Sequence, residues 1–351
     1  MGARLLPLID GQLVLDRVQL DGLNVRLQRD AAGQGNWAAL LARLNRPAGA
    51  STTSLREFGG LSLRNSSVQY RDASGSIFAL TNWRVETGAM IPQQPFSVET
   101  SFDLGGAGAG AAASAGGGVA IVFRSRVAAY KDRLNLTDVA AELRLQSPGV
   151  PAAGGRVRLS APQLQADWST PIQSWTAPEA SLQSGAAIMQ WHRAQLRLVS
   201  DAPPQASADF DLRPTSLRTL LESLGVQVPR TRDPNALARF SATGKLTCCG
   251  AGVALDQLAL QLDDSHFTGR IADLAPSKVM EFQLHGDSLQ LDRYRKPANE
   301  HSEPFVFPNA QLAALRARGT LSLDQAQMAG ADFRGVTLQL LFADGSLGTT
   351  P

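Results

Sequence analysis

Residues 13–37 read LVLDRVQLDGLNVRLQRDAAGQGNW, and the alternation of side chains in this stretch decides the fold. Leu23, Val25 and Leu27 alternate with the polar residues Asn24 and Arg26, and a turn rich in Asp and Gly follows. Because successive side chains of a β-strand point to opposite faces, this pattern predicts a half-buried strand with one apolar and one polar face.

The same period of two recurs along the 351 residues, and Gly, Asp, Asn, Ser and Pro separate the segments. A unit of two short strands and a turn cannot bury its apolar face alone, so it must stack on its neighbours. The chain is therefore predicted to be mainly β, with a long curved sheet favoured over a compact sandwich. The other alternating segments include 61–63, 68–70, 141–145, 194–198, 258–262 and 336–340.

Helical signals are few. Asn36 is predicted to cap a short helix that carries Trp37, Leu40, Leu41 and Leu44. Thr215 or Ser216 is predicted to cap a second helix that ends at Gly225, and Asp233-Pro234 to start a third. These signals divide the chain into segments 1–213 and 214–351, the second of which opens with two helices. The glycine- and alanine-rich run 105–118 is predicted to be a flexible hairpin tip within the first segment.

Composition excludes several classes of protein. The apolar fraction of 44 % and charged fraction of 18 % are typical of a globular chain, and the net charge of +2 gives no reason to expect a nucleic-acid partner. No apolar window is long enough to cross a membrane as a helix. The start, MGARLLPLID, has an apolar run that is too short for a signal peptide.

Reactive side chains form no recognisable constellation. The four histidines lack zinc-ligand spacing, and no nucleophile or phosphate-binding motif is present in a fitting context. The sequence therefore predicts no catalytic residue, metal or cofactor, and a protein that is not an enzyme. Cys248 and Cys249 are adjacent, and because adjacent cysteines rarely bridge, they are predicted to be small apolar residues of a strand, with a redox switch as the alternative.

A chain made of strands with one apolar face needs something to cover that face. A second sheet would give a sandwich, and helices would give a layered fold, although too few helices are predicted. A bound apolar ligand is the third alternative. The residues alone leave these alternatives open.

Three segments resemble the AsmA family of Gram-negative envelope proteins. LIDGQLVLDRVQLDGLNVRLQRDAAGQGNWAALL, residues 8–41, resembles the family's N-terminal strand pair with its Asn-Trp and short helix. SLRTLLESLGVQVPRTRDPNALARFSATGKLT, residues 216–247, resembles its paired short helices that lead into a new strand. FQLHGDSLQLDRYRKP, residues 282–297, and FRGVTLQLLFADGSLGTTP, residues 333–351, resemble its strand signatures.

The resemblance implies an open hydrophobic groove along an elongated, curved, mostly antiparallel sheet, related in style to TamB and to bridge-like lipid transfer proteins. It implies a periplasmic protein that binds phospholipid and supports lipid transport between the inner and outer membranes, or outer-membrane assembly. The alternative is an assembly factor that pairs an exposed edge strand with outer-membrane protein clients. Family members are anchored in the inner membrane by an N-terminal helix and continue beyond the position matching Pro351, so the chain resembles a fragment that lacks both parts.

The groove is predicted to present alternating apolar residues to acyl chains, whereas a closed core between two sheets is the alternative role for the same side chains. Arg26, Arg64, Arg144 and Arg197 are candidates to meet lipid phosphates, with ordinary outward-facing strand residues as the alternative. The predicted groove residues are Leu23, Val25, Leu27, Leu61, Leu63, Val68, Tyr70, Leu143, Leu145, Leu196, Leu198, Leu258, Leu260, Leu262, Val336, Leu338 and Leu340.

Overall fold

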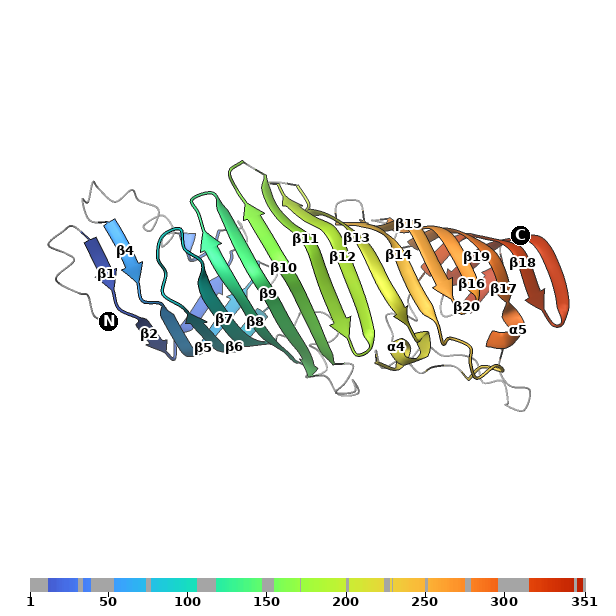
Figure 1. Ribbon diagram of the computed structural model, residues 1–351, viewed down its shortest axis with the longest axis horizontal. Helices are drawn as coiled ribbons and strands as arrows, with labels where there is room; N and C mark the ends of the chain where they lie inside the picture. The colour runs from blue at the N-terminus through green and yellow to red at the C-terminus, as the bar shows by residue number, and fades with distance from the viewer. Residues whose placement is uncertain are drawn as a thin grey trace. The chain divides into compact units, whose positions relative to one another are not determined.

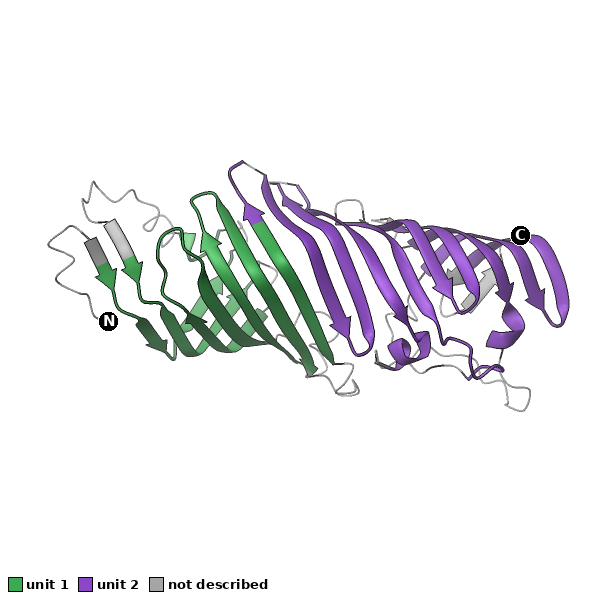
Figure 2. Cartoon of the chain, in the orientation of Figure 1, with its two compact units in different colours: residues 1–150, 155–165 green, residues 151–154, 166–351 purple. Residues whose placement is uncertain are grey.

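The computed structural model divides into two compact units, coloured separately in Figure 2. Unit 1 contains residues 1–150 and 155–165, and unit 2 contains residues 151–154 and 166–351. Each unit is a β-sheet. The residues that the structure describes are 12–30, 34–38, 54–73, 77–105, 118–146, 155–170, 172–199, 202–223, 228, 230–249, 252–274, 279–295, 316–343 and 346–349.

The sheet of unit 1 begins with parallel pairs and continues as an antiparallel meander (Figure 1). β1 and β4 pair in parallel as a separate two-stranded sheet. In the main sheet of the unit, both β2 and β3 pair with β5 in parallel. From β5 to β9, each strand pairs antiparallel with the next. The bounds are β1 (Gln12–Leu15), β2 (Val18–Asp21), β3 (Asn24–Gln28), β4 (Ser54–Phe58), β5 (Leu61–Arg71), β6 (Ile77–Thr87), β7 (Phe96–Gly105), β8 (Gly118–Ala129), β9 (Arg133–Gln146) and β10 (Arg156–Asp167), of which the last two residues belong to unit 2.

The sheet of unit 2 is antiparallel from β11 to β17, has one parallel pair, β17 with β18, and ends antiparallel. Short helices follow β13 and β17, and the sequence-predicted boundary at 213/214 falls inside this unit, near the end of β13. The bounds are β11 (Gln173–Ser184), β12 (Ala187–Leu198), β13 (Gln205–Thr215), α4 (Leu217–Ser223), β14 (Phe240–Cys248), β15 (Gly252–Leu262), β16 (Ser265–Leu274), β17 (Val279–Gln290), α5 (Leu291–Tyr294), β18 (Arg316–Met328), β19 (Ala331–Ala343) and β20 (Ser346–Thr349).

The predicted fold class is confirmed: the described residues are mainly β, most strand pairs are antiparallel, and the two described helices are short. The sheets are curved, and in Figure 1 β19 and β20 of unit 2 pass behind β15 and β16. The glycine- and alanine-rich run lies outside the described residues, apart from Gly105, which ends β7, and Gly118, which begins β8.

The helix predictions have three outcomes. The second helix is confirmed as α4, and the backbone N–H of Thr219 donates to the Ser216 hydroxyl at 3.3 Å, as an N-cap does. The third helix is wrong, because residues 234–237 form a turn that ends at Leu237 with a φ of +64°. The first helix falls mainly on residues outside the described part of the chain.

β-bulges interrupt the alternation at polar residues. Asn65, Asn82, Asp138, Arg193 and Gln257 lie inside strands with φ between +49° and +53°, beside a shift in strand register. A bulge inserts one extra residue, so the apolar set before it and the apolar set after it face the same side. In β5 the bulge at Asn65 therefore brings Leu63 and Val68 to one face, although five positions separate them.

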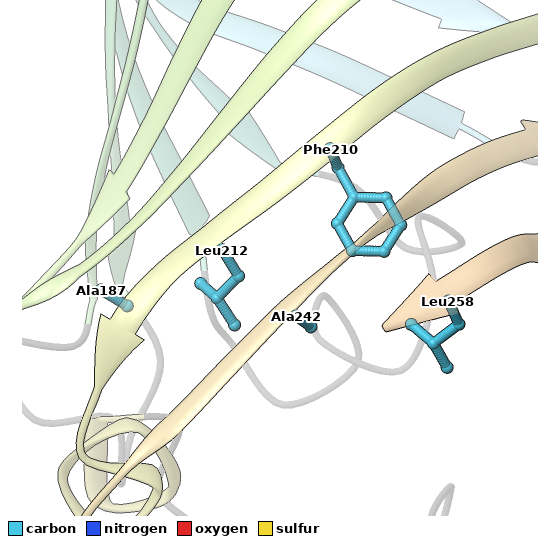
Figure 3. Close-up of a cluster of buried hydrophobic side chains, with 5 residues drawn as sticks. All are labelled: Ala187, Phe210, Leu212, Ala242 and Leu258. Carbon is cyan, nitrogen blue, oxygen red and sulfur yellow. The ribbon is translucent and has the colours of Figure 1, made fainter. Parts of the chain in front are cut away.

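The core of unit 2 lies on one face of its sheet. Figure 3 shows Ala187, Phe210, Leu212, Ala242 and Leu258, which come from β12, β13, β14 and β15 and are all buried. A second cluster joins Phe267 of β16 to Leu323 and Ala326 of β18. Apolar burial of this kind supplies most of the stability of a sheet layer.

Gly286 of β17 allows the second cluster to form. A Cβ atom at this position would lie 2.8 Å from side-chain carbons of both Leu323 and Phe267. Because these side chains are buried, they have little room to withdraw. Gly286→Val is expected to destabilise the chain by about 1 to 3 kcal/mol in urea unfolding followed by circular dichroism. Gly105→Val is the control, since no atom lies within 4 Å of its Cβ position. An equal loss in both variants would contradict the close contact.

Candidate functional site

In unit 1 the strand register brings the predicted groove residues to one face. Val25 pairs with Val68, and Leu27 pairs with Tyr70. Leu61 and Leu63 pair with Val18 and Leu20 on the other parallel strand. Paired residues share a face of the sheet. The remaining pairs at predicted positions are Leu63 with Val85, Val68 with Leu80, Leu143 with Ile121, and Leu145 with Val119. Leu23 precedes β3 by one residue and is exposed.

In unit 2 the register joins the predicted residues of β15 and β19 through the strands between them. Two transverse rows of paired residues are continuous across five strands. One row is Leu260, Phe267, Gly286, Leu323 and Val336, and the next is Leu258, Gly269, Leu284, Leu321 and Leu338. Leu340 pairs with Gly319 on the same face, Leu262 pairs with Ser265, and Leu198 pairs with Gln173.

We call these surfaces the apolar face of each unit. In unit 2 the apolar face includes large residues that the sequence reasoning did not select, because their strands alternate less regularly. Trp191 packs on Phe210 with ring centroids 6.1 Å apart, and Phe267 and Leu323 form the second cluster. Glycine or serine shares the apolar face in β16 and β17, which conceals the period-two signal in the sequence.

The apolar face of unit 2 is packed at one end and exposed at the other. At the packed end Leu258 is 3 % exposed and Leu323 is 2 % exposed. At the other end a row of paired residues runs from Trp175 through Leu196, Ala206 and Cys248 to Val253. Trp175 is 36 % exposed and Val253 is 45 % exposed. Side chains at this exposed end retain apolar surface that the protein itself does not cover.

α4, residues 230–239 and α5 lie at the packed end, which we call the covered rim. Leu220 of α4 packs against the cluster that contains Leu212 and Phe210. The Arg293 guanidinium bonds to Asp233 at 2.9 Å and to Asp264 at 2.8 Å. These contacts hold the helical segments against the strand ends.

Asp263 organises the covered rim. It is 2 % exposed, and its carboxylate accepts hydrogen bonds from the backbone N–H groups of Leu237, Ala238 and Arg239 and from the Tyr294 hydroxyl, at 2.8 to 3.1 Å. Burial raises the pKa of Asp263, but these hydrogen bonds outweigh it and leave the pKa below its ordinary value. Burial and the bond to Asp263 raise the pKa of Tyr294. The predicted third helix fails because Asp263 takes the N–H groups of residues 237–239.

The opposite face of each sheet is polar and carries ion pairs across strands. Arg64 of β5 pairs with Glu86 of β6 at 3.2 Å, and Arg156 of β10 pairs with Glu142 of β9 at 3.2 Å. Within β9, Arg144 pairs with the same Glu142 at 2.8 Å. The hydrogen bond from Ser62, together with the hydrogen bond from Arg64 and the charge of Arg17, holds the pKa of Glu86 below its ordinary value. Arg64 and Arg144 therefore lie on the face opposite the apolar residues, where they neutralise carboxylates. Of the other candidate arginines, Arg197 lines a polar hollow of about 480 Å³ with Gln205, Ser207, Thr247 and Arg270.

The two cysteines correct one prediction. Cys248 and Cys249 form a disulfide, rather than two unbridged apolar residues. Cys249 lies just after β14 with a φ of +97°, a backbone conformation that brings the two neighbouring side chains together. Its N–H donates to the Gly252 carbonyl at 2.9 Å, which closes the turn into β15.

Among the described residues, no group of His, Cys, Asp and Glu is arranged to hold a metal ion. No helix in the described ranges is long and apolar enough to cross a membrane. What the structure presents instead is an extended apolar surface on one side of a sheet, with a charged surface on the other. Such a surface binds by burial of apolar area rather than by directed chemistry.

A sheet of this construction, built from meandering strands and interrupted by short helices, defines a β-sheet protein with one apolar and one polar face. The AsmA family model matches residues 1–322, and the chain belongs to the AsmA family. Membership fits a function associated with the bacterial envelope. Among curated proteins and among solved structures, none matches the chain.

Proposed function

We propose that the apolar faces bind the acyl chains of phospholipids, and that the protein supports lipid transport between the inner and outer membranes or outer-membrane assembly. The observation that carries the proposal is the row from Trp175 to Val253 on the apolar face, whose two end residues remain exposed, while the opposite face carries ion pairs. Each methylene that leaves water for such a surface contributes about 0.8 kcal/mol. Two acyl chains therefore bind without a specific pocket.

Periplasmic location follows from the same proposal, since an acyl carrier between two membranes works in the space between them. Inner-membrane anchoring is a family property and is proposed for the whole protein only. The apolar face requires no cofactor. Specificity for the head group is expected to be low, because the row from Trp175 to Val253 is aliphatic, aromatic or small, and its one charged neighbour in register is Asp273, which pairs with Val253.

The alternative function, capture of client strands at a sheet edge, has less support at β3. The Asn36 side chain accepts from the Gln28 N–H at 3.1 Å and donates to the Arg26 carbonyl at 3.0 Å. The Asn36 N–H also donates to the Gln28 carbonyl at 3.0 Å. Asn36 thus takes the place of a neighbouring strand, and Trp37 packs near Tyr70. An edge that is already paired does not recruit another chain.

Lipid extraction and mass spectrometry test the proposal. The 351-residue chain, exported to the periplasm and purified without detergent, is expected to carry phospholipid in near-stoichiometric amount. The double variant Leu196→Asp and Val253→Asp is expected to lose most of it while keeping the circular dichroism spectrum of a β protein. Charges at the exposed end can stay hydrated, so the fold tolerates them.

Leu341→Asp is the matched control. Leu341 is exposed and pairs with Arg318 on the polar face, so its replacement alters apolar surface of similar size on the wrong side of the sheet. Lipid content should match that of the wild type. A well-folded wild type without lipid would exclude the proposal, and binding of unfolded outer-membrane protein under the same conditions would favour the alternative.

A further inference from the structure

The end of the unit 2 sheet opposite the covered rim carries a cluster of exposed apolar side chains. Trp168 lies in the turn between β10 and β11, and Ile172 and Val199 lie one position beyond the last paired residues of β11 and β12, Gln173 and Leu198. The three side chains are 37 to 44 % exposed. We call Trp168, Ile172 and Val199, with the row from Trp175 to Val253, the exposed rim.

The backbone of the exposed rim is ordered by hydrogen bonds. Ser169 donates both its N–H and its hydroxyl to the Asp167 carboxylate, at 2.9 and 2.6 Å. The Thr170 hydroxyl donates to the Ile172 carbonyl at 3.0 Å, and the Ala202 N–H donates to the Val199 carbonyl at 3.3 Å. These hydrogen bonds fix the described backbone beside the exposed apolar side chains.

The two rims differ in the surface that they offer to a partner. The covered rim carries ion-paired groups such as Arg293, Asp233, Asp264 and Arg239, which are costly to remove from water. The exposed rim combines tryptophan with aliphatic residues. Tryptophan is enriched at membrane interfaces because its ring is apolar while its indole N–H still donates to polar groups.

A cation lies behind the exposed rim. Arg197 pairs in register with Ser174 and lines the hollow of about 480 Å³ together with Gln205, Ser207 and Thr247. Arg197 makes no ion pair with the described residues, whereas Arg270 in the same hollow is paired with Asp256 at 2.7 Å. The hollow also contains the carboxylate of Asp273, at the β15–β16 side away from β11. On the side of Arg197, a guanidinium with hydroxyl and amide groups beside an apolar rim matches the order of groups across a phospholipid interface, in which phosphates lie above acyl chains.

We propose that the exposed rim is a membrane-contact site, at which Trp168, Ile172 and Val199 enter the interface of a phospholipid bilayer and Arg197 meets lipid phosphate. The rim is continuous with the apolar face through Trp175 and Leu196, so a lipid leaving the bilayer there reaches the apolar face without crossing a charged surface. The role of this membrane-contact site in lipid transfer rests on the proposed function. The partner it adds is the surface of a phospholipid bilayer.

Vesicle binding tests the membrane-contact site. The 351-residue chain is mixed with phosphatidylcholine vesicles, with and without phosphatidylglycerol, and bound protein is measured by sedimentation and by quenching of tryptophan fluorescence with brominated phosphatidylcholine. The triple variant Trp168→Ser, Ile172→Ser and Val199→Ser is expected to partition about ten-fold more weakly. Arg197→Gln is expected to remove the additional binding that phosphatidylglycerol gives.

The matched control is Met328→Ser with Phe333→Ser. Both side chains are at least as exposed as those of the triple variant. They lie in β18 and β19 beside the turn that Asp292 of α5 contacts, at the opposite end of the strands. The control should bind vesicles as the wild type does. Equal weakening in the control and the triple variant would overturn the proposal, as would wild-type binding by the triple variant.

Lipid carried by the purified chain separates this inference from the proposed function. Carried lipid without vesicle binding would overturn the membrane-contact site and leave the proposed function standing. Rim-dependent vesicle binding without carried lipid would support the membrane-contact site and remove the acyl-chain role. The triple variant changes Trp168, Ile172 and Val199, which lie outside the row from Trp175 to Val253. It therefore leaves that row of the apolar face intact.

Discussion

Leu323→Asp is expected to unfold unit 2. Leu323 is 2 % exposed and packs with Phe267 and Ala326, so the aspartate would place an unpaired charge in a dry cluster. Truncation of such a residue to alanine costs about 2 to 5 kcal/mol, and a buried charge costs more. Since a domain has about 5 to 15 kcal/mol of stability, the aspartate variant should lose the native circular dichroism spectrum of this unit at 25 °C.

Two further variants are controls for the loss of packing and for the added charge. Leu323→Ala should remain folded with a lower urea midpoint, and Leu341→Asp, on the polar face of the neighbouring strand, should be near the wild type. A folded Leu323→Asp variant with an unchanged midpoint would show that the packed end is open to solvent. Together with Leu196→Asp at the exposed end, the series distinguishes the part of the apolar face that is a packed core from the part that can bind acyl chains.

Asp263→Asn is expected to produce the second large effect, a loss of about 3 kcal/mol or more. The amide replaces one acceptor oxygen by an NH₂ group that faces backbone N–H donors or the Tyr294 hydroxyl. Asn is the appropriate replacement because residue 263 has a φ of +52°, which Asn tolerates as well as Asp does. Tyr294→Phe removes a single hydrogen bond and should cost about 1 to 2 kcal/mol.

The acid dependence of stability checks the role of the Asp263 charge. The folded pKa of Asp263 is below its unfolded value of about 3.9, so its contribution is complete above that value and is lost as the pH falls through the folded pKa. Urea midpoints measured between pH 7 and pH 3 should therefore fall more steeply in the wild type than in Asp263→Asn. Parallel curves would contradict a carboxylate that is ionised in the folded state.

The pattern of alternating apolar and polar residues was sufficient to predict the strands and their two faces, and a capping residue was sufficient to predict the second helix. An apolar face is predicted from Leu258, Leu260 and Leu262, because side chains alternate between the two faces along a strand. Ser216 predicts the start of α4, because its hydroxyl accepts a hydrogen bond from a backbone N–H group that has no partner within the helix. These signals are local, and neighbours in the chain are enough to produce them.

Contacts between residues that are distant in the sequence decided the features that the local pattern did not predict. Asp263 draws the N–H groups of residues 237–239 away from a helix, and Asn36 satisfies the edge of β3, yet neither role is visible in the local pattern. The bulges at Asn65 and Arg193 keep apolar segments on one face although their spacing breaks the alternation. Sequence alone therefore determined that each sheet has an apolar face. Only the tertiary structure decided which end of the face in unit 2 is packed, because burial depends on residues such as Phe267 and Leu323 that meet across Gly286 from separate strands.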